Sequence, residues 1–341
     1  MGKYKKPTLK DIADKLQVSK VTVSKSLRNH PDISAEMKQK VKETAMKLGY
    51  IPNKAASMLS ARKTNTIGLI VPKIAHSFFS SLIESIYKHA RENNYEIILT
   101  PSLEDTELQV KHLLTMISMK VDGILISVTY DTKDKKIYDV IKKNNIPIVE
   151  IDRTIDDSLT QVVFDDIGGT FNAISYAIDN GFSKIAFVGG NHNANIGKDR
   201  FAGYVKALKK YRIKINKSWI LEGGLEEKDG YDALKLFYEQ NNLPEIIFAV
   251  TYPVALGVVS AAKELKLKIP RDIDLISFGD SEFNRFIHPA ISCVNHKTEK
   301  MGRIAVDKII DAIESDESPY AEKIIISSRL IIKGTCKYRR K

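Results

Sequence analysis

The chain has 341 residues, 43% of them hydrophobic and 28% charged, a length and composition that fit two or three globular units. No stretch approaches 18 consecutive uncharged apolar residues, which excludes a membrane-spanning helix, and no apolar stretch follows the basic N-terminus, so we expect no signal peptide and a cytoplasmic location. The formal net charge is +11, and its position along the chain is informative.

The positive charge is confined to the N-terminal end. Residues 1–63 hold fifteen Lys or Arg and five acidic residues, whereas the other 278 residues hold 38 basic and 37 acidic ones. A nearly neutral body with one basic end indicates a polyanionic partner, most often nucleic acid. A solvated run of charge is the alternative, but a run alone would not show the helical pattern of this segment.

Three short helices are predicted within this basic segment. Thr8-Leu9-Lys10-Asp11 has the form of a capping box that opens the first helix, and Ser19 is a favourable N-cap for the second. The third begins at Ser34 and ends at Gly49. Two helices joined by a tight turn and followed by a third match the helix-turn-helix plan, in which the second helix enters the major groove of DNA. A three-helix bundle without a ligand is the alternative, and the basic outward face argues against it.

The outward face of the second helix has side chains suited to reading DNA. Lys20 and Lys25 can donate to guanine acceptors. Val21 can touch a thymine methyl group, and Ser24 can bond a phosphate. A further short helix is predicted from Asn53 to Ser60. Because an isolated helix of two turns is marginal in water, we expect it to be ordered only when something packs on it.

The chain resembles the lactose-repressor (LacI) family of bacterial regulators in three strings of residues, TLKDIADKLQVSKVTVSKSLRNHPDIS, VKETAMKLGYIPNKAASMLS and TIGLIVP, and the resemblance extends from Thr8 to about Thr335. Members of that family are ligand-gated regulators, more often repressors than activators, that read a palindrome as homodimers. The resemblance therefore implies sequence-specific binding of double-stranded DNA by a homodimer, controlled by a small molecule. Corepressor-dependent or activating regulation stays open, as does a plain small-molecule-binding protein.

The resemblance also implies a DNA-binding role for individual residues. Lys20, Val21 and Lys25 occupy base-reading positions of the recognition helix. Residues 53–60 form a hinge helix that lies in the minor groove beside its dimer mate, and Leu59 wedges into the central base step and kinks the duplex. The full set of candidate DNA-binding residues is Thr8, Ser19, Lys20, Val21, Thr22, Ser24, Lys25, Asn53, Lys54, Ala56 and Leu59.

The remainder of the chain alternates short apolar strands with helices. Such alternation is the signature of parallel sheets, and two series of strands imply two similar lobes with a ligand cleft between them. The family resemblance implies the periplasmic-binding-protein fold, with three chain crossings between the lobes. Strands are predicted at 66–71, 96–100, 123–128, 146–151 and 161–165, then at 184–190, 245–250 and 274–278, and a strand-like stretch follows at 324–334.

The predicted fold class is α/β, with a helix-turn-helix head and a hinge helix before a two-lobed, periplasmic-binding-protein-like effector domain of doubly wound parallel sheets. We expect no catalytic activity, because the chain contains no GxSxG, GxxxxGKS/T or HExxH motif and no GxGxxG after a strand. Cys293 and Cys336 lie far apart, in no metal or redox spacing, so we expect neither a metal nor a cofactor. The predicted domains are a DNA-binding domain at 1–51, a hinge helix and linker at 52–65, and an effector-binding and dimerisation domain at 66–341.

Effector contacts are expected at the ends of strands. Phe78 and Phe79 can stack on a sugar or base face, and core packing is the alternative for one of the pair. Asp152 can accept from hydroxyl groups, and Arg200 can bind a planar or polyhydroxylated ligand bidentately. A salt-bridged surface group is the alternative for each of these two residues. The resemblance implies a carbohydrate effector. Its identity stays open, because pairs of polar residues that the family usually has at strand ends of the second lobe are altered in this chain. The candidate effector-binding residues are Phe78, Phe79, Asp152, Arg200, Thr251, Tyr252 and Asp280.

Overall fold

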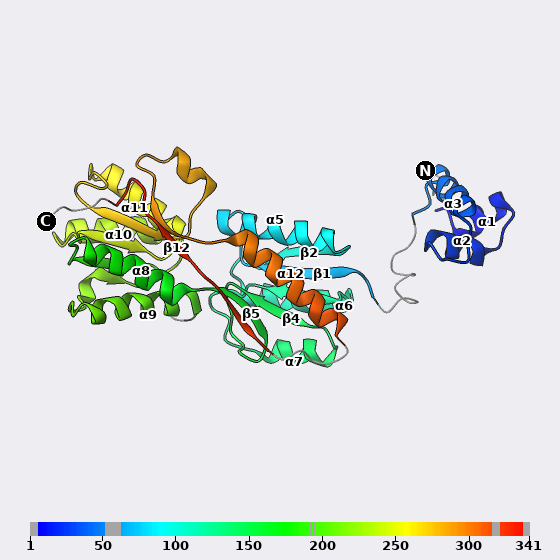
Figure 1. Cartoon of the computed structure of the whole chain (residues 1–341), viewed down its shortest axis with the longest axis horizontal. Coiled ribbons are helices and arrows are strands. Elements are labelled where there is room, and N and C mark those ends of the chain that lie inside the picture. The colour runs from blue at the N-terminus through cyan, green and yellow to red at the C-terminus, as the bar shows by residue number, and fades with distance from the viewer. Residues whose placement is uncertain (1–5, 52–62, 191–192, 194, 316–320, 337–341) are drawn as a thin grey trace. The chain divides into compact units, whose positions relative to one another are not determined.

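The chain forms two compact units, Met1–Thr64 and Asn65–Lys341, which we call the head and the body (Figure 1). The predicted hinge helix at 53–60, with Asn53, Lys54, Ala56 and Leu59, lies outside the described residues. The structure is a computed structural model, and it describes residues 6–51, 63–190, 193, 195–315 and 321–336.

Three helices form the part of the head that the structure describes, and local side-chain caps set their ends as the sequence predicts. Thr8 forms a capping box with Asp11, and the hydroxyls of Ser19 and Ser34 each accept a hydrogen bond from the backbone amide three residues later. Gly49 ends the third helix with a left-handed φ of 67°, which costs a residue without a Cβ little. The helices are α1 (Leu9–Leu16), α2 (Lys20–Leu27) and α3 (Ala35–Leu48).

The body has two lobes, each built on a six-stranded sheet. In spatial order, the sheet of lobe 1 consists of β11 (Lys323–Ile326), β5 (Thr160–Phe164), β4 (Ile148–Ile151), β3 (Gly123–Ile126), β1 (Thr66–Val71) and β2 (Glu96–Pro101). That of lobe 2 consists of β12 (Arg329–Ile331), β10 (Ser292–Asn295), β9 (Asp274–Phe278), β8 (Ile246–Ala249), β6 (Ile185–Val188) and β7 (Ile220–Leu221). Replacing β1 to β5 by β6 to β10, and β11 by β12, converts one order into the other, so the two lobes share one strand order. Among the strand pairs of the described residues, only that of β12 with β10 is antiparallel.

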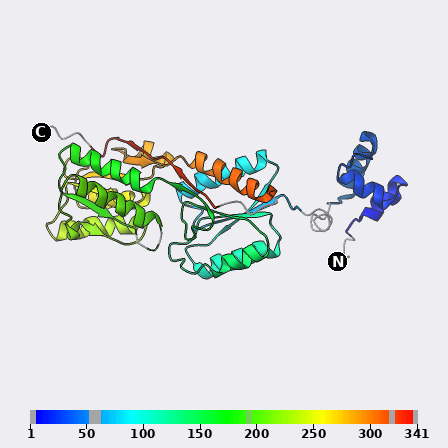
Figure 2. The ribbon, with the colours of Figure 1, turned by 60° about the horizontal axis from the view of Figure 1, so that its bottom comes forward.

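Helices cover both faces of the sheet in lobe 1 (Figure 2). They are α5 (Ser77–Glu92) and α12 (Thr298–Glu314) on one face, and α6 (Thr106–Ser118) and α7 (Lys136–Lys143) on the other. Because successive side chains of a strand point to opposite faces, Ile67, Leu69 and Val71 of β1 enter the core beneath α5 and α12. Ile70 enters the separate core beneath α6 and α7. A strand buried on both faces explains the continuous apolar run in the sequence.

Lobe 2 is built in the same way, with α8 packed beside α9 and α10 packed beside α11 (Figure 1). Its helices are α8 (Asp166–Asp179), α9 (Asn195–Lys210), α10 (Glu227–Glu239) and α11 (Tyr252–Glu264), with the short 3-10 helices η1 (Lys217–Trp219) and η2 (Glu282–Phe286). Gly230 and Gly257 bring α10 and α11 into backbone contact, since a Cβ at either position would overlap a carbonyl group of the other helix. None of the helices in the described ranges has the length and hydropathy that a membrane span requires.

The chain passes between the lobes three times, as the family resemblance implies: from β5 to α8, from β10 to α12, and from β11 to β12. The third crossing corrects the sequence prediction for residues 324–334. This stretch is two strands in different sheets, separated by Ser327 and Ser328. The strands β7 and β10 have no counterpart in the sequence prediction. β7 is only two residues long, and β10 mixes polar with apolar residues, so neither shows an apolar run.

Candidate functional site

A cavity lies where the carboxyl ends of the strands in both lobes meet. Both sheets reverse their strand order beside the first strand of the series, and ligands of doubly wound sheets bind at this switch point. The cavity encloses about 560 Å³ of empty space, counting the part open to solvent. Its lining residues are Lys73, His76, Ser77, Phe78, Glu104, Asp152, Arg153, Ile196, Arg200, Leu225, Glu226, Thr251, Tyr252, Phe278, Gly279, Asp280 and His296.

The cavity brings together most of the predicted effector-binding residues. The ones that line it are Phe78, Asp152, Arg200, Thr251, Tyr252 and Asp280. Phe79 is not among them: it is 3% exposed and packs in the core of lobe 1 beneath α5. Core packing, the alternative considered for one Phe of the pair, is therefore the position that Phe79 occupies. Direct contact of the other six with an effector stays a prediction.

Arg200 is fixed inside the cleft by groups of lobe 2. Its Nε donates to Oδ1 of Asp166 at 2.8 Å, and both side chains are 3% exposed. Its Nη1 donates to the carbonyl of Val250, and its guanidinium carbon lies 3.9 Å from the centre of the Phe278 ring. A guanidinium held by an ion pair, a carbonyl and an aromatic face has one orientation, in which it lines the cavity.

Asp152 is the most strongly perturbed carboxyl group of the cleft. It follows β4 with a left-handed φ of 60°, which is uncommon for a residue with a Cβ. Burial raises the pKa of Asp152 from its ordinary value of 3.8 to about 6, although the charges of Arg153 and Arg200 favour the ionised form. Arg153 itself is paired with Glu104 at 2.7 Å.

Polar contacts connect the two lobes beside the cavity. Asn195, in the first turn of α9, accepts from the amide of Thr154 and donates to the carbonyl of Asp152, both at 3.0 Å. Lys73 of lobe 1 pairs with Glu226 of lobe 2 at 2.6 Å. These contacts join the two lobes beside the cavity.

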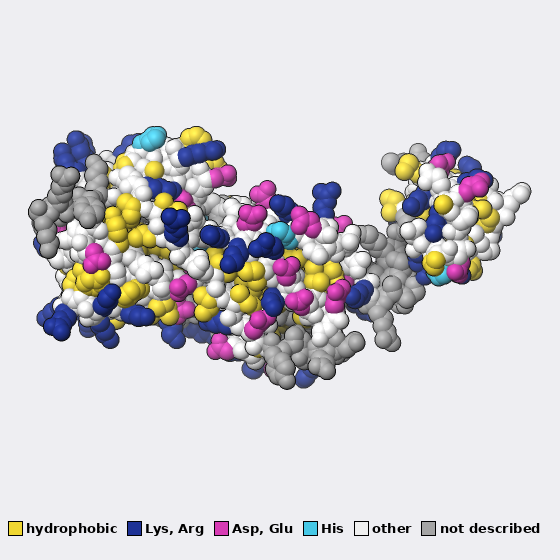
Figure 3. Space-filling model, viewed as in Figure 1, with side chains coloured by type: hydrophobic (Ala, Val, Ile, Leu, Met, Phe, Trp, Pro, Cys, Tyr) yellow, Lys and Arg dark blue, Asp and Glu magenta, His cyan; other side chains and the backbone are white. Residues whose placement is uncertain are grey.

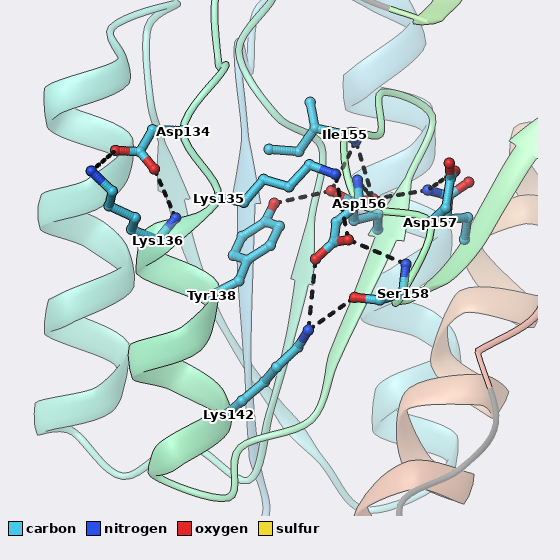
Figure 4. A network of polar contacts seen from close by, with 11 residues as sticks. Asp134, Lys135, Lys136, Tyr138, Lys142, Ile155, Asp156, Asp157 and Ser158 are labelled. Carbon is cyan, nitrogen blue, oxygen red and sulfur yellow. Dashed lines mark hydrogen bonds and ion pairs between the residues drawn. The ribbon is translucent and has the colours of Figure 1, made fainter.

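A buried carboxylate anchors the loop that carries Asp152. Glu150 is fully buried, and burial raises its pKa, although four hydrogen-bond donors favour its charged form. Those donors are the hydroxyl of Tyr138, the backbone amides of Ile155 and Asp156, and the side-chain amide of Gln161. Figure 4 shows that the loop is also tied to α7, where Lys142 reaches both Asp156 and Ser158. The loop is therefore positioned from inside lobe 1.

Two polar lining residues of lobe 2, Thr251 and Asp280, are engaged within the protein. The hydroxyl of Thr251 donates to the carbonyl of Leu225 at 2.8 Å and caps the start of α11. Asp280 pairs with Lys333 at 2.7 Å and accepts a hydrogen bond from Asn284. Burial disfavours the charged form of Asp280, but these bonds outweigh it and lower the pKa of the carboxyl group.

His296 is a lining residue that the sequence prediction missed. Its ring lies 5.1 Å from that of Phe78, 5.0 Å from that of Phe278 and 4.6 Å from that of Phe164, so it completes an aromatic wall between the lobes. Burial lowers its pKa well below the usual range, so the ring is neutral. Its position directly after a strand could have revealed it, but that strand, β10, is not visible in the sequence pattern.

The candidate DNA-binding residues that the structure describes lie in α2 or at its N-cap, except Thr8, which caps α1. Val23 faces the core and is fully buried, whereas Val21 is 64% exposed. Lys20 is exposed beside it, while Lys25 pairs with Asp32 at 3.0 Å. Over the face of the body that Figure 3 shows, Lys and Arg are interspersed with Asp and Glu. Of the other candidates, Thr8 and Ser19 cap helices, Thr22 donates its amide to Ser19, and Ser24 accepts from Arg28.

Two family models match the chain. Residues 64–334 match the model described as periplasmic binding proteins and sugar binding domain of the LacI family. Residues 8–53 match the model described as bacterial regulatory proteins, lacI family. Together they cover most of the head and almost the whole body.

Individual relatives and solved structures agree with these matches. "HTH-type transcriptional repressor PurR" of Pasteurella multocida (strain Pm70) is 29% identical over 334 residues, which cover 97% of this chain and 99% of the relative. "Probable HTH-type transcriptional repressor ExuR" of Bacillus subtilis (strain 168) is 31% identical over 333 residues, covering 96% and 98%. A crystal structure of the lac repressor dimer bound to operator and the anti-inducer ONPF has the same fold, with a TM-score of 0.85, 20% identity and coverage of 97% and 99%.

Proposed function

Because this chain belongs to the lacI family of bacterial regulatory proteins, we propose that it represses transcription at a palindromic operator and that a small molecule bound in the cavity of the body controls this repression. The chain is a DNA-binding transcription regulator with a ligand-binding body. The observation that carries the proposal is the surface of α2, a capped helix that presents Lys20 and Val21 outward from a basic head. An exposed basic helix face of this kind fits the edges of bases in a major groove.

Operator binding uses two copies of the chain. The recognition helix of each copy enters the major groove of one half-site, where Lys20, Val21 and Lys25 face the bases. The pairing of Lys25 with Asp32 in the free head is exchanged for a contact with DNA. Residues 53–60 form the hinge helix in the minor groove, and Leu59 wedges between bases at a cost of a few kcal/mol that the contacts of the bent complex offset. A two-fold axis then matches the palindrome, so the functional unit is a homodimer.

Effector binding in the cavity changes the angle between the lobes and separates the paired hinge helices. The coupling must be reciprocal, so an effector that weakens operator binding is itself bound more weakly by the operator complex. A corepressor reverses the sign through the same machinery. Equal ligand affinity with and without operator DNA would contradict this mechanism.

The effector class that we propose is a carbohydrate. A matching family model describes a sugar binding domain, and the cavity combines aromatic rings with a carboxyl group that can accept from hydroxyls. The protein performs no chemistry on this ligand, so recovered effector should be unchanged after prolonged incubation. Since its partner is chromosomal DNA, the protein acts in the cytoplasm.

Selection from a random duplex library at about 0.15 M salt tests the regulator function. Retention of a palindrome with a flexible central step is the expected result, and it supplies the operator for effector screening. Specific affinity should fall by roughly 10³–10⁵ between about 50 and 200 mM salt if 6–10 phosphates are contacted. Failure of folded protein to retain any duplex, with or without candidate sugars, would overturn the proposal.

Leu59→Ala tests the wedge separately from the recognition helix. The variant should lose affinity for the selected operator while keeping its affinity for random DNA, because unstacking occurs only in the bent specific complex. An equal loss on both kinds of DNA would exclude the wedge role for Leu59.

A further inference from the structure

One stretch of lobe 2 concentrates positive charge. Between Asp199 and Glu222 the sequence contains no acidic residue, and residues 206–217 hold six Lys or Arg. The rest of the body, residues 64–205 and 218–341, holds 32 basic and 37 acidic residues, so it carries a net negative charge. The body as a whole is therefore nearly neutral only because this stretch offsets an acidic remainder. We call the six residues the lysine face: Lys206, Lys209, Lys210, Arg212, Lys214 and Lys217.

The charges of the lysine face are not neutralised by the part of the chain that the structure describes. All six residues are exposed, and none of them forms an ion pair with a described residue. Elsewhere in lobe 2, Lys235 pairs with Glu264 at 3.1 Å and Lys333 pairs with Asp280 at 2.7 Å. Because like charges at this density repel one another, the lysine face gains most from an external polyanion.

Two lysines of the face are held in place by an aromatic ring. The helix α9 packs beside α8 (Figure 1), and Nζ of Lys206 and of Lys210 lie 5.3 and 5.2 Å from the ring centre of Phe171 in α8. Cation–π contacts of this kind restrain side chains that would otherwise move freely in solvent. The two lysines are about one helical turn apart, which is roughly 6 Å along the axis. Successive phosphates of one DNA strand rise about 3.4 Å each, so the two ammonium groups can meet different phosphates of that strand.

The composition of the lysine face indicates which kind of polyanion it fits. Five of its six residues are Lys, a compact point charge that suits phosphates contacted without regard to sequence. Protein–protein interfaces, in contrast, are depleted in Lys. A helix that lies on a membrane exposes large apolar side chains, and residues 195–221, all of them described, expose none. The face therefore fits double-stranded DNA better than an acidic protein or a lipid surface.

We propose that the lysine face is a second DNA-contacting surface, which binds the phosphate backbone of double-stranded DNA without sequence preference. The inference goes beyond the proposed function, since the head reads the operator and the lysine face belongs to the body. A chain with two such surfaces can hold a second stretch of duplex while the head is bound. Sequence-independent contacts of this kind speed association with DNA and allow sliding and hopping along it.

Titration of the full chain with a short duplex of random sequence tests the proposal. Sedimentation velocity at about 50 mM salt counts the duplexes that each chain holds at saturation. The variant Lys206→Gln, Lys209→Gln, Lys210→Gln should hold fewer than the unsubstituted chain, because half of the lysine face loses its charge. Affinity for the additional duplex should fall roughly 40-fold between about 50 and 200 mM salt if three phosphates are contacted. Operator selection by the head is scored separately, so a wrong function and a wrong second surface give different results.

The matched control removes the same charge elsewhere in lobe 2, with Lys228→Gln, Lys263→Gln and Lys266→Gln at exposed positions. It should hold as many duplexes as the unsubstituted chain. Equal counts for all three proteins, each with an unchanged circular dichroism spectrum, would overturn the proposal. An equal loss in the control and in the variant of the lysine face would overturn it too, because the effect would then be one of total charge.

Photo-cross-linking locates the contact directly. A benzophenone amino acid replaces Lys209 in one full-length protein and Lys263 in another, and each protein is irradiated with the duplex. Cross-links to DNA should form from the first position and not from the second, since only the first lies in the lysine face. Equal yields from the two positions would contradict the proposal. Tighter binding of anionic lipid vesicles or of polyglutamate than of the duplex would assign the face to another partner and overturn it.

Discussion

Replacing Asp166 by Ala tests whether a buried ion pair holds lobe 2 together around Arg200. Both partners are 3% exposed, and Nε of Arg200 lies 2.8 Å from Oδ1 of Asp166. Removal of the carboxylate leaves a guanidinium charge in a place that water does not reach. Breaking a buried pair in this way typically costs about 3–5 kcal/mol.

Two contacts that survive the substitution place the expected loss near the lower end of that range. Arg200 still donates to the carbonyl of Val250 and still lies over the ring of Phe278. We therefore expect the free energy of unfolding to fall by about 3 kcal/mol. For a unit of this size each kcal/mol lowers Tm by roughly 2–4 °C, so Tm should fall by about 6–12 °C.

Urea unfolding and scanning calorimetry of the full chain measure this loss. The control is Asp179→Ala at the other end of α8, where an exposed carboxylate accepts a hydrogen bond from Tyr211 at 3.0 Å. Its loss should stay below about 1 kcal/mol, as for other exposed groups. If Asp166→Ala loses no more stability than Asp179→Ala, the reasoning is refuted and the pair is not what stabilises lobe 2.

Three further predictions concern separate parts of the chain. Ser19→Ala removes the cap of α2, in which the Ser19 hydroxyl accepts a hydrogen bond from the amide of Thr22 at 3.0 Å. The loss of ~1–2 kcal/mol of helix stability should speed amide hydrogen exchange in α2 by about 5–30-fold. Unchanged exchange rates would contradict this prediction. Asp152→Asn should remove a pH dependence of stability. Because the pKa of Asp152 is raised in the folded state, its contribution to stability is present below about pH 3.8 and is lost as the pH rises through about 6. The free energy of unfolding of the variant, relative to that of the unsubstituted chain, should therefore grow with pH in that window by at most about 1.4 kcal/mol per pH unit. Gly257→Ala forces α10 and α11 apart and should cost more than about 2 kcal/mol in urea unfolding, whereas Ser260→Ala, on the exposed side of α11, should cost almost nothing.

Much of the head could be predicted from the sequence because its helix ends depend on neighbours. The cap residues Thr8, Ser19 and Ser34 each bond to an amide three positions away. Gly49 adopts its left-handed φ because it has no Cβ, a property of the residue itself. Interactions of this range are visible in a string of letters. The long apolar strands of both lobes were predicted for a related reason, since burial on both faces leaves a continuous apolar run.

Other elements depend on partners that are distant in sequence. Residues 324–334 show one strand-like pattern, yet β11 joins lobe 1 beside β5 and β12 joins lobe 2 beside β10. No local feature of the sequence shows which of the two sheets each strand joins. The two-residue strand β7 exists only because β6 offers it a free edge.

The cleft shows most clearly the difference between what the local sequence predicts and what distant contacts decide. Strand-end position and family resemblance were enough to select Phe78, Asp152 and Arg200, because the topology of a parallel sheet collects the residues that follow its strands. Only the tertiary structure decided that Phe79 packs in the core and that Arg153 is neutralised by Glu104, 49 positions away. The physical reason is that caps and periodicity are local properties of the backbone, whereas burial, ion pairing and the desolvation that shifts a pKa depend on which distant side chains the fold brings together.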